Sequence, residues 1–296
     1  MPQEKDKGEI RRASSLSPLF AALGLALLLA ACASRVGFPS ASHSRPVMLS
    51  GHLYRPNGEG PFPAIVLHHG CGGPGRSIFG WASWLRAEGY VALVVDSFSP
   101  RGITNVCDRR GVLRPGEVVL DALGALAYLR SLDVVDPDRI GVMGWSFGGR
   151  VTLLAGRELL GKAVRPPAGG FRAAVAFYPS CSGGLADDII PLLLLLGEAD
   201  DWTPAAPCVE AARRAQQQGR TVLWTVYPLA YHAFDVDARP RVYLGHHMEY
   251  NHLATRDAEN QVRAFLAEYV RGVPSSATGE DREDPHHAAA ARITGR

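Results

Sequence analysis

Short, almost wholly apolar runs alternate along this chain with longer amphipathic runs, and this alternation limits how it can fold. Strands are apolar throughout when helices cover both faces of their sheet. Alternating strands and helices are typical of a parallel sheet. The sequence therefore predicts an α/β fold with a doubly wound, mostly parallel sheet. The predicted strands are Ala64–His68, Tyr90–Val95, Ile140–Met143, Ala173–Phe177, Leu192–Leu196 and Thr221–Tyr227. The predicted helices are Ser77–Glu88, Gly116–Leu132, Phe147–Glu158, Pro204–Gln217 and Leu253–Val270.

The composition is that of an ordinary globular protein. Hydrophobic residues make up 47% of the chain and charged residues 20%, which is enough apolar material for a sizeable core. The formal net charge is only +2, and no run of lysine or arginine occurs. Nucleic acid is therefore not an expected partner.

The N-terminal segment has the pattern of an export signal. Leu19–Ala31 is uninterrupted apolar sequence that follows Arg11 and Arg12 and precedes small residues. A membrane-spanning helix needs about 20 apolar residues, and this run is shorter. We therefore expect residues 1–31 to be a signal peptide that is removed.

Leu29-Ala30-Ala31-Cys32 resembles a bacterial lipoprotein box, in which the cysteine carries the lipid. It predicts an exported, envelope-bound protein facing the periplasm, with membrane contact only through the anchor. Cleavage after Ala33 is the alternative, since Ala31-Cys32-Ala33 also fits a small-x-small site. The protein would then be soluble in the periplasm or secreted.

Composition also sets the expected domain limits. The Ser- and Gly-bearing stretch 32–45 predicts a flexible tether, and 46–271 a single catalytic domain. The polar stretch 272–296 lacks apolar periodicity and predicts a disordered tail.

Four cysteines remain besides Cys32, and an exported protein can keep disulfides. We expect one or two disulfides, with the pairing open and buried free thiols as the alternative. No CxxC spacing or clustered histidine accompanies these cysteines, so no metal site is expected. They are Cys71, Cys107, Cys181 and Cys208.

The motif Gly144-Trp145-Ser146-Phe147-Gly148 is the strongest chemical signal. It follows a predicted strand and opens a predicted helix, which is the context of a nucleophile elbow. The sharp turn would expose the Ser146 hydroxyl, and the helix N-terminus would favour developing negative charge. Ser146 is thus the candidate nucleophile.

A nucleophilic serine needs a base and an acid that orients the base, and these should follow later strands in that fold. Asp200 comes directly after the apolar strand Leu192–Leu196, with Asp201 as the alternative acid or as a helix N-cap. His232 follows the strand Thr221–Tyr227 and is the expected base.

Two backbone amides should bind the developing oxyanion. We expect those of Phe147 and Cys71, the latter in the glycine-rich loop after the first predicted strand. Arg101 and Trp145 are possible substrate-binding residues. A salt bridge of Arg101 to a neighbouring acid, such as Asp96 or Asp108, is the competing interpretation.

HHGCGG, GWSFGG, GEADDWTP and YHAFD together resemble the dienelactone hydrolase family, over about Pro46 to Val270. The resemblance implies an α/β-hydrolase fold without a large cap domain. It also implies cofactor-free hydrolysis of lactones and carboxylic esters, with Ser146, Asp200 and His232 as triad. Founding members instead use a cysteine nucleophile and a glutamate in the early loop. We therefore expect a serine-nucleophile variant acting on a small ester or lactone of unspecified structure.

Two rival functions remain open at this point. A non-catalytic envelope lipoprotein could use the fold for binding, but degenerate hydrolases usually lose a triad member. A small serine peptidase could share the triad order of prolyl oligopeptidases, but those carry a large propeller domain for which this chain has no room. The sequence does not predict the oligomeric state.

Overall fold

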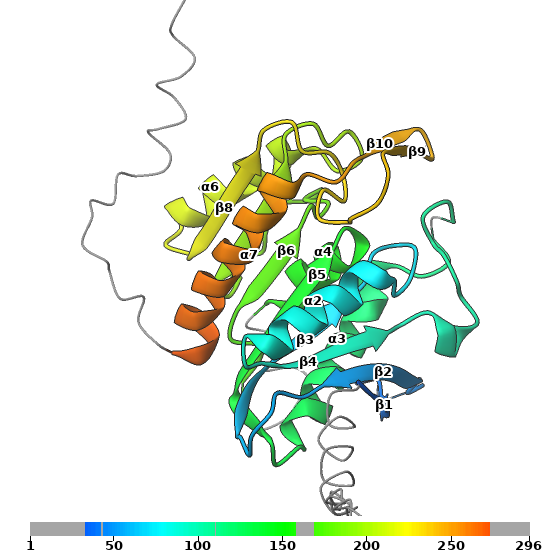
Figure 1. The fold of residues 1–296 in the computed structure, drawn as a ribbon, viewed down its shortest axis with the longest axis vertical. Coiled ribbons are helices and arrows are strands. Elements are labelled where there is room, and N and C mark those ends of the chain that lie inside the picture. Colours follow the sequence, from blue (N-terminus) through cyan, green and yellow to red (C-terminus); the bar gives the residue numbers. More distant parts are fainter. Residues whose placement is uncertain (1–32, 43, 110, 158–168, 273–296) are drawn as a thin grey trace, which may run out of the picture.

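Eight strands form one twisted sheet in the computed structural model, which describes residues 33–272 except 43, 110 and 158–168 (Figure 1). Their order is β1-β2-β4-β3-β5-β6-β7-β8. The strands from β4 to β8 in this order run parallel, whereas β1 and β2 pair antiparallel at one edge. The bounds are β1 Ser34–Pro39, β2 Met48–Tyr54, β3 Phe62–His68, β4 Val91–Asp96, β5 Val135–Trp145, β6 Ala174–Phe177, β7 Leu192–Gly197 and β8 Val222–Tyr227.

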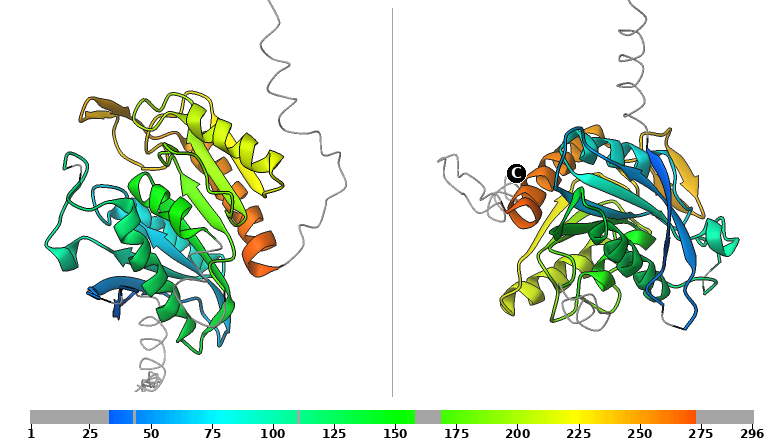
Figure 2. Two further views of the ribbon diagram at one scale, coloured as in Figure 1. Left: turned by 180° about the vertical axis from the view of Figure 1, so that it is seen from behind. Right: turned by 90° about the horizontal axis from the view of Figure 1, so that it is seen from below.

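Helices cover both faces of this sheet, as the alternation of runs predicts. Helices α2 (Arg76–Ala87) and α7 (His252–Leu266) lie on one face, and α7 continues into the π-helical turn Ala267–Arg271. The opposite face, seen from behind in Figure 2, is covered by α3 (Pro115–Arg130), α4 (Phe147–Ala155) and α6 (Ala205–Gln217). The predicted doubly wound α/β fold is confirmed.

The sheet separates two apolar cores. In β3, Ala64 and Val66 contact the α3–α4–α6 face, whereas Ile65 and Leu67 contact the α2–α7 face. Successive side chains of a strand point to opposite faces, so each central strand supplies both cores. This explains why these strands are apolar at every position.

The first strand corrects the predicted domain limits. Ser34–Pro39 lies in the stretch predicted as a tether, yet it pairs with β2 over its whole length, from Ser34 opposite Leu53 to Pro39 opposite Met48. Phe38 is buried and its ring stacks on Tyr128 of α3 at 5.1 Å. The folded domain therefore includes Ser34–Pro39, upstream of the predicted limit at Pro46, because backbone pairing and one buried aromatic ring hold this segment.

Other sequence-based expectations fall outside the described residues. These are the signal segment 1–31, the lipidation site Cys32 and the tail from residue 273 onward. Within the described ranges, no helix has the length and apolar character needed to cross a bilayer.

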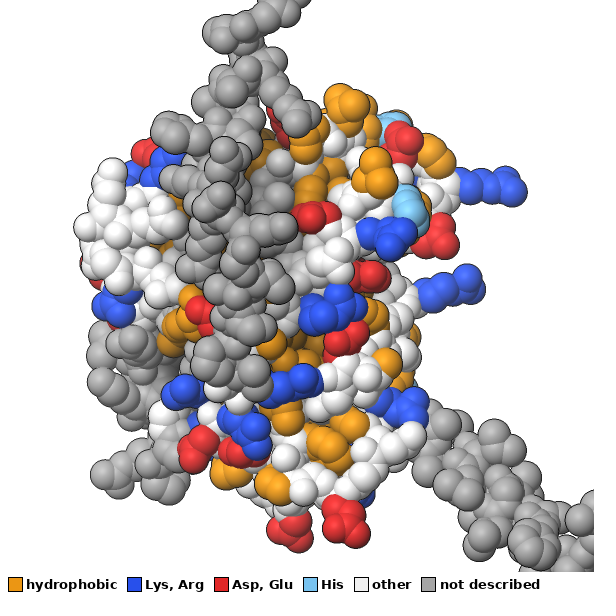
Figure 3. Space-filling view, turned by 60° about the vertical axis from the view of Figure 1, so that its left-hand side comes forward, with side chains coloured by type: hydrophobic (Ala, Val, Ile, Leu, Met, Phe, Trp, Pro, Cys, Tyr) orange, Lys and Arg blue, Asp and Glu red, His pale blue; other side chains and the backbone are white. Residues whose placement is uncertain are grey.

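A short hairpin was not predicted. Strands β9 (Arg241–Tyr243) and β10 (His246–Met248) lie between β8 and α7 along the chain and pair antiparallel with each other. Met248 also forms an isolated β-bridge with His232. The hairpin lies at the carboxyl end of the parallel strands (Figure 1). On the side shown in Figure 3, acidic and basic side chains are interspersed among hydrophobic ones.

Replacing Phe38 by alanine tests whether β1 belongs to the folded domain. Loss of a buried phenylalanine costs about 3–5 kcal/mol in the free energy of unfolding. We expect a loss of this size for Phe38→Ala by urea denaturation. Arg35→Ala, in the same strand but exposed, should change stability by less than about 0.5 kcal/mol. Equal, small effects of both variants would show that the segment is only a tether.

Candidate active site

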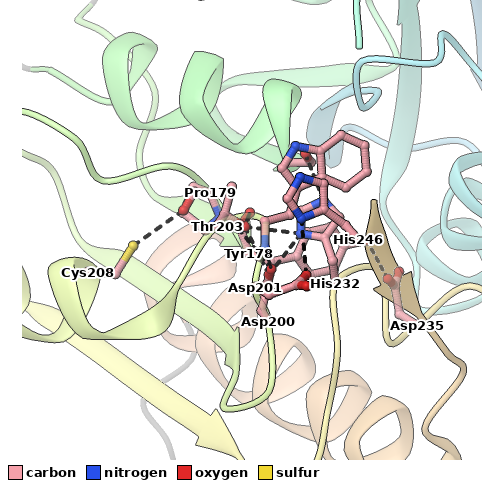
Figure 4. A network of polar contacts seen from close by, with 11 residues as sticks. Tyr178, Pro179, Asp200, Asp201, Thr203, Cys208, His232, Asp235 and His246 are labelled. Atoms are coloured by element: carbon pink, nitrogen blue, oxygen red, sulfur yellow. Dashed lines mark hydrogen bonds and ion pairs between the residues drawn. The ribbon is translucent and has the colours of Figure 1, made fainter. Parts of the chain in front are cut away.

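Three polar side chains that follow three different strands meet at the carboxyl edge of the sheet. Ser146 follows β5, Asp200 follows β7 and His232 follows β8. His232 Nδ1 lies 2.8 Å from Asp200 Oδ2 (Figure 4). On the other side of the ring, His232 Nε2 lies 3.0 Å from Ser146 Oγ. The structure thus brings together the three residues that the sequence selects.

Ser146 occupies a sharp turn between β5 and α4. Its φ of 52° and ψ of −111° lie in a region that residues other than glycine rarely adopt. The turn needs glycine on both sides: a Cβ on Gly144 would lie 2.3 Å from the Gly148 oxygen, and a Cβ on Gly148 only 2.1 Å from the His68 oxygen. The G-x-S-x-G spacing is therefore a steric requirement of this elbow.

The loop after β7 distinguishes Asp200 from Asp201. Asp200 Oδ1 accepts hydrogen bonds from the amides of Trp202 (2.9 Å) and Thr203 (2.8 Å), which turn its second oxygen toward His232. Asp201 instead points to solvent and contacts His246 at 3.2 Å. The alternative acid is thus excluded by geometry, and Asp201 is not the N-cap either, since that position belongs to Pro204.

The direction of these hydrogen bonds prepares His232 to accept a proton. Burial raises the pKa of Asp200, but hydrogen bonds from His232 and Thr203 outweigh burial and hold that pKa below its ordinary value. Asp200 is therefore a carboxylate at neutral pH and can only accept, so Nδ1 of His232 carries the hydrogen. Nε2 is left as an acceptor for the hydroxyl of Ser146.

Thr203 is a fourth member of this group, which the sequence analysis missed. Its hydroxyl lies 2.9 Å from Asp200 Oδ2, 3.0 Å from His232 Nδ1 and 3.0 Å from the Tyr178 carbonyl oxygen. It links the loop after β7 to the loop after β6. GEADDWTP contains the residue, but only folding places it beside the histidine.

Ser146 and His232 open onto a cavity of about 450 Å³, a size suited to a small organic ligand. Most of its wall is apolar or aromatic, with Trp145, Tyr178, Trp202 and Tyr243 among the lining side chains. The charged residues that line it are arginines only, Arg76 and Arg241, and neither forms an ion pair within the described part of the chain. The cavity suits an apolar molecule that carries a polar or anionic end.

The two expected oxyanion donors come from two different segments, the first turn of α4 and the loop after β3. Phe147 begins α4, and its amide is one of the first-turn N–H groups that a helix leaves free. Cys71 lines the cavity in the loop after β3, and its amide has no acceptor among the described residues. Neither amide therefore has an acceptor among the described residues.

Both pairs of cysteines form disulfides, and both lie at this edge of the sheet. Cys71 is bonded to Cys107 in the loop after β4, and Cys181 after β6 to Cys208 in α6. The prediction of one or two disulfides is confirmed, since two are present. Their pairing, which the sequence left open, is Cys71–Cys107 and Cys181–Cys208.

Arg101 does not reach the cavity. Its guanidinium forms a bidentate pair with Asp121 of α3, at 2.8 and 2.9 Å, and also donates to the Ser97 carbonyl. The suggestion that Arg101 binds substrate is corrected. The competing interpretation, a salt bridge to a nearby acid, is confirmed, although the partner is Asp121 and not Asp96 or Asp108. Trp145 does line the cavity, while its indole N–H is held by Asp235 at 2.9 Å.

Asp235 is a buried carboxyl that accepts three side-chain hydrogen bonds, and the sequence did not predict this role. Its carboxyl accepts hydrogen bonds from the Tyr178 hydroxyl (2.5 Å) and from the indoles of Trp81 (2.8 Å) and Trp145 (2.9 Å). Burial raises its pKa, and the hydrogen bonds only partly oppose this. The Tyr178 ring packs against His232 with centroids 4.7 Å apart, so Asp235 holds the aromatic wall behind the histidine.

Asp235→Asn tests this role. The amide keeps one acceptor oxygen but turns an NH₂ group toward buried donors, which costs about 1–3 kcal/mol of stability. We expect that loss in urea unfolding, whereas Asp237→Asn, two residues later and exposed, should stay within about 0.5 kcal/mol. Indistinguishable unfolding curves of the two variants would contradict the assigned role.

Among the described residues, no group of three or more His, Cys, Asp or Glu side chains is arranged to hold a metal ion.

Comparison with known proteins gives a consistent set of similarities. The model of the dienelactone hydrolase family matches residues 49–270. A Bradyrhizobium protein named "Probable 2-oxo-3-(5-oxofuran-2-ylidene)propanoate lactonase" is 26% identical over 75% of this chain and 90% of its own. The crystal structure of a "Putative Dienelactone Hydrolase" from Klebsiella pneumoniae superposes with a TM-score of 0.63 at 23% identity, covering 80% of this chain and 100% of that one. Esterase 2 of Thermogutta terrifontis has the same fold, with a TM-score of 0.59 at 19% identity, covering 80% and 94% of the two chains.

Proposed function

The chain belongs to the dienelactone hydrolase family and is a hydrolase of ester or lactone type. We propose that it cleaves its substrate with Ser146 as the nucleophile, through an acyl-enzyme intermediate. The observation that carries this proposal is the row Ser146–His232–Asp200, with distances of 3.0 and 2.8 Å, at the wall of the cavity. A serine aligned with a base that an acid orients is the arrangement of an activated nucleophile.

The first half of the reaction forms the acyl-enzyme. Ser146 Oγ attacks the carbonyl carbon, and His232 Nε2 takes the serine proton. The carbonyl oxygen becomes an oxyanion that accepts hydrogen bonds from the amides of Phe147 and Cys71. Collapse of this intermediate breaks the acyl C–O bond, and His232 protonates the departing alcohol oxygen, which stays attached to the acyl group when the substrate is a lactone.

The second half returns the free enzyme. A water molecule attacks the acyl carbon while His232 accepts its proton, and the same two amides bind the second oxyanion. Collapse breaks the bond to Ser146 Oγ, which regains the proton from His232. Asp200 keeps the imidazole in one tautomer and stabilises its protonated form in both halves.

Covalent labelling tests the nucleophile. A fluorophosphonate probe should label the purified protein, and Ser146→Ala should abolish labelling and lower kcat on any accepted ester at least about 10⁴-fold. Ser83→Ala serves as control, since Ser83 lies exposed on α2. Folded wild-type protein without labelling or turnover would instead favour the binding-module function.

The two cavity arginines predict which esters are preferred. A charged hydrogen bond is worth about 1.5–3 kcal/mol, so Arg76→Gln or Arg241→Gln should raise KM about tenfold or more for an ester that carries a carboxylate. The KM of a neutral ester of the same size should change little. Arg239→Gln is the matched control, because Arg239 is exposed and does not line this cavity. Equal effects on charged and neutral esters would contradict anion recognition.

A further inference from the structure

We propose that His69 is a positioning residue. Together with the Cys71–Cys107 disulfide, it holds the Gly70–Cys71 peptide with its N–H toward the oxyanion. This inference rests on the proposed function, because it concerns one of the two amides assigned there to the oxyanion. His69 itself has no part in the proton transfers of Ser146, His232 and Asp200.

The His69 ring is held in one orientation and one tautomer. Nδ1 lies 2.8 Å from the carbonyl oxygen of Gly70, which can only accept, so Nδ1 carries the hydrogen. Nε2 accepts from the Ser97 amide at 3.4 Å. The ring also packs edge-on against Phe98, with centroids 4.4 Å apart, and the residue is only 4% exposed. Both nitrogens are thus used, and the donor points at Gly70.

Holding the Gly70 oxygen fixes the next amide. That oxygen also accepts from the Gly73 amide at 3.1 Å, so two donors fix its direction. A trans peptide is planar, with its C=O and N–H pointing in opposite directions. The two hydrogen bonds therefore also fix the direction of the Cys71 N–H, which points away from both donors, and Cys71 lines the cavity.

The remainder of Cys71 is tied to the loop after β4. Its carbonyl oxygen accepts from the Val106 amide at 2.8 Å, and its sulfur is bonded to Cys107, with the two Cα atoms 4.9 Å apart. The peptide also adjoins the elbow, since a Cβ on Gly70 would lie 3.9 Å from the Ser146 Cβ. Cys71 is therefore held on its side chain and on both flanking peptides.

A donor held in this way acts on the transition state, because the oxyanion exists only there. Loss of one oxyanion donor typically lowers kcat about 10²–10³-fold. Loss of its alignment should likewise lower kcat and leave KM nearly unchanged. A merely structural role of His69 would instead change the amount of folded protein without this separation of kcat from KM.

The experiment compares His69→Leu, which removes the donor, with His69→Asn, whose side-chain amide can still donate to the Gly70 oxygen. We expect His69→Leu to lower kcat at least about tenfold with KM within about twofold. Inhibition by a trifluoromethyl ketone, which forms an oxyanion on reaction with Ser146, should weaken by a similar factor. His69→Asn should recover most of both quantities.

A second variant covers the case in which His69→Leu does not fold. Cys71→Ala/Cys107→Ala keeps the amide but removes the disulfide, and it should lower kcat with KM unchanged. Wild-type kcat in a folded His69→Leu protein, or in the disulfide variant, would overturn the inference while leaving the proposed function intact. A wild-type protein that neither labels with fluorophosphonate nor turns over esters would overturn the proposed function first.

Discussion

The first turn of α4 lies directly against the end of β3, and this backbone contact determines the spacing of the whole site. Any side chain at Gly148 would collide with the carbonyl oxygens of His68 and His69, at 2.1 and 2.5 Å from a Cβ. The contact places the elbow after β5 and the glycine-rich loop after β3 side by side. Ser146 and the Cys71 amide are neighbours for that reason, although 75 positions separate them in numbering (146 − 71).

The residues that sequence reasoning identified are those whose position follows from local chain geometry. Ser146 lies within a motif whose glycines and flanking elements specify one turn. Asp200 and His232 lie in the loops that follow β7 and β8, and the carboxyl ends of parallel strands share one edge. For these three residues, knowing the strand order was nearly sufficient. Choosing Asp200 over Asp201 needed the amide hydrogen bonds of the following turn.

The residues that sequence reasoning missed depend on contacts between distant segments. Arg101 pairs with Asp121, which sits on a helix 20 positions later and has no pattern that marks it as a partner. Thr203, Asp235 and His69 owe their roles to packing against loops from other strands. Strand β1 was not predicted because only two of its six residues, Val36 and Phe38, are large and apolar before it ends in proline.

The position of the sheet between two separate cores has a consequence for how substitutions combine. Val66 of β3 contacts only the α3–α4–α6 core, and its neighbour Leu67 only the α2–α7 core. A substitution that changes side-chain volume on one face alters the packing of that face only, because the hydrogen-bonded backbone of the sheet separates the two cores. Substitutions in contact on one face are therefore energetically coupled, whereas those on opposite faces that lie more than about 7–10 Å apart and share no contact should add almost independently. Each layer can repack by itself while the strands keep the carboxyl edge, and with it the geometry around Ser146, in register.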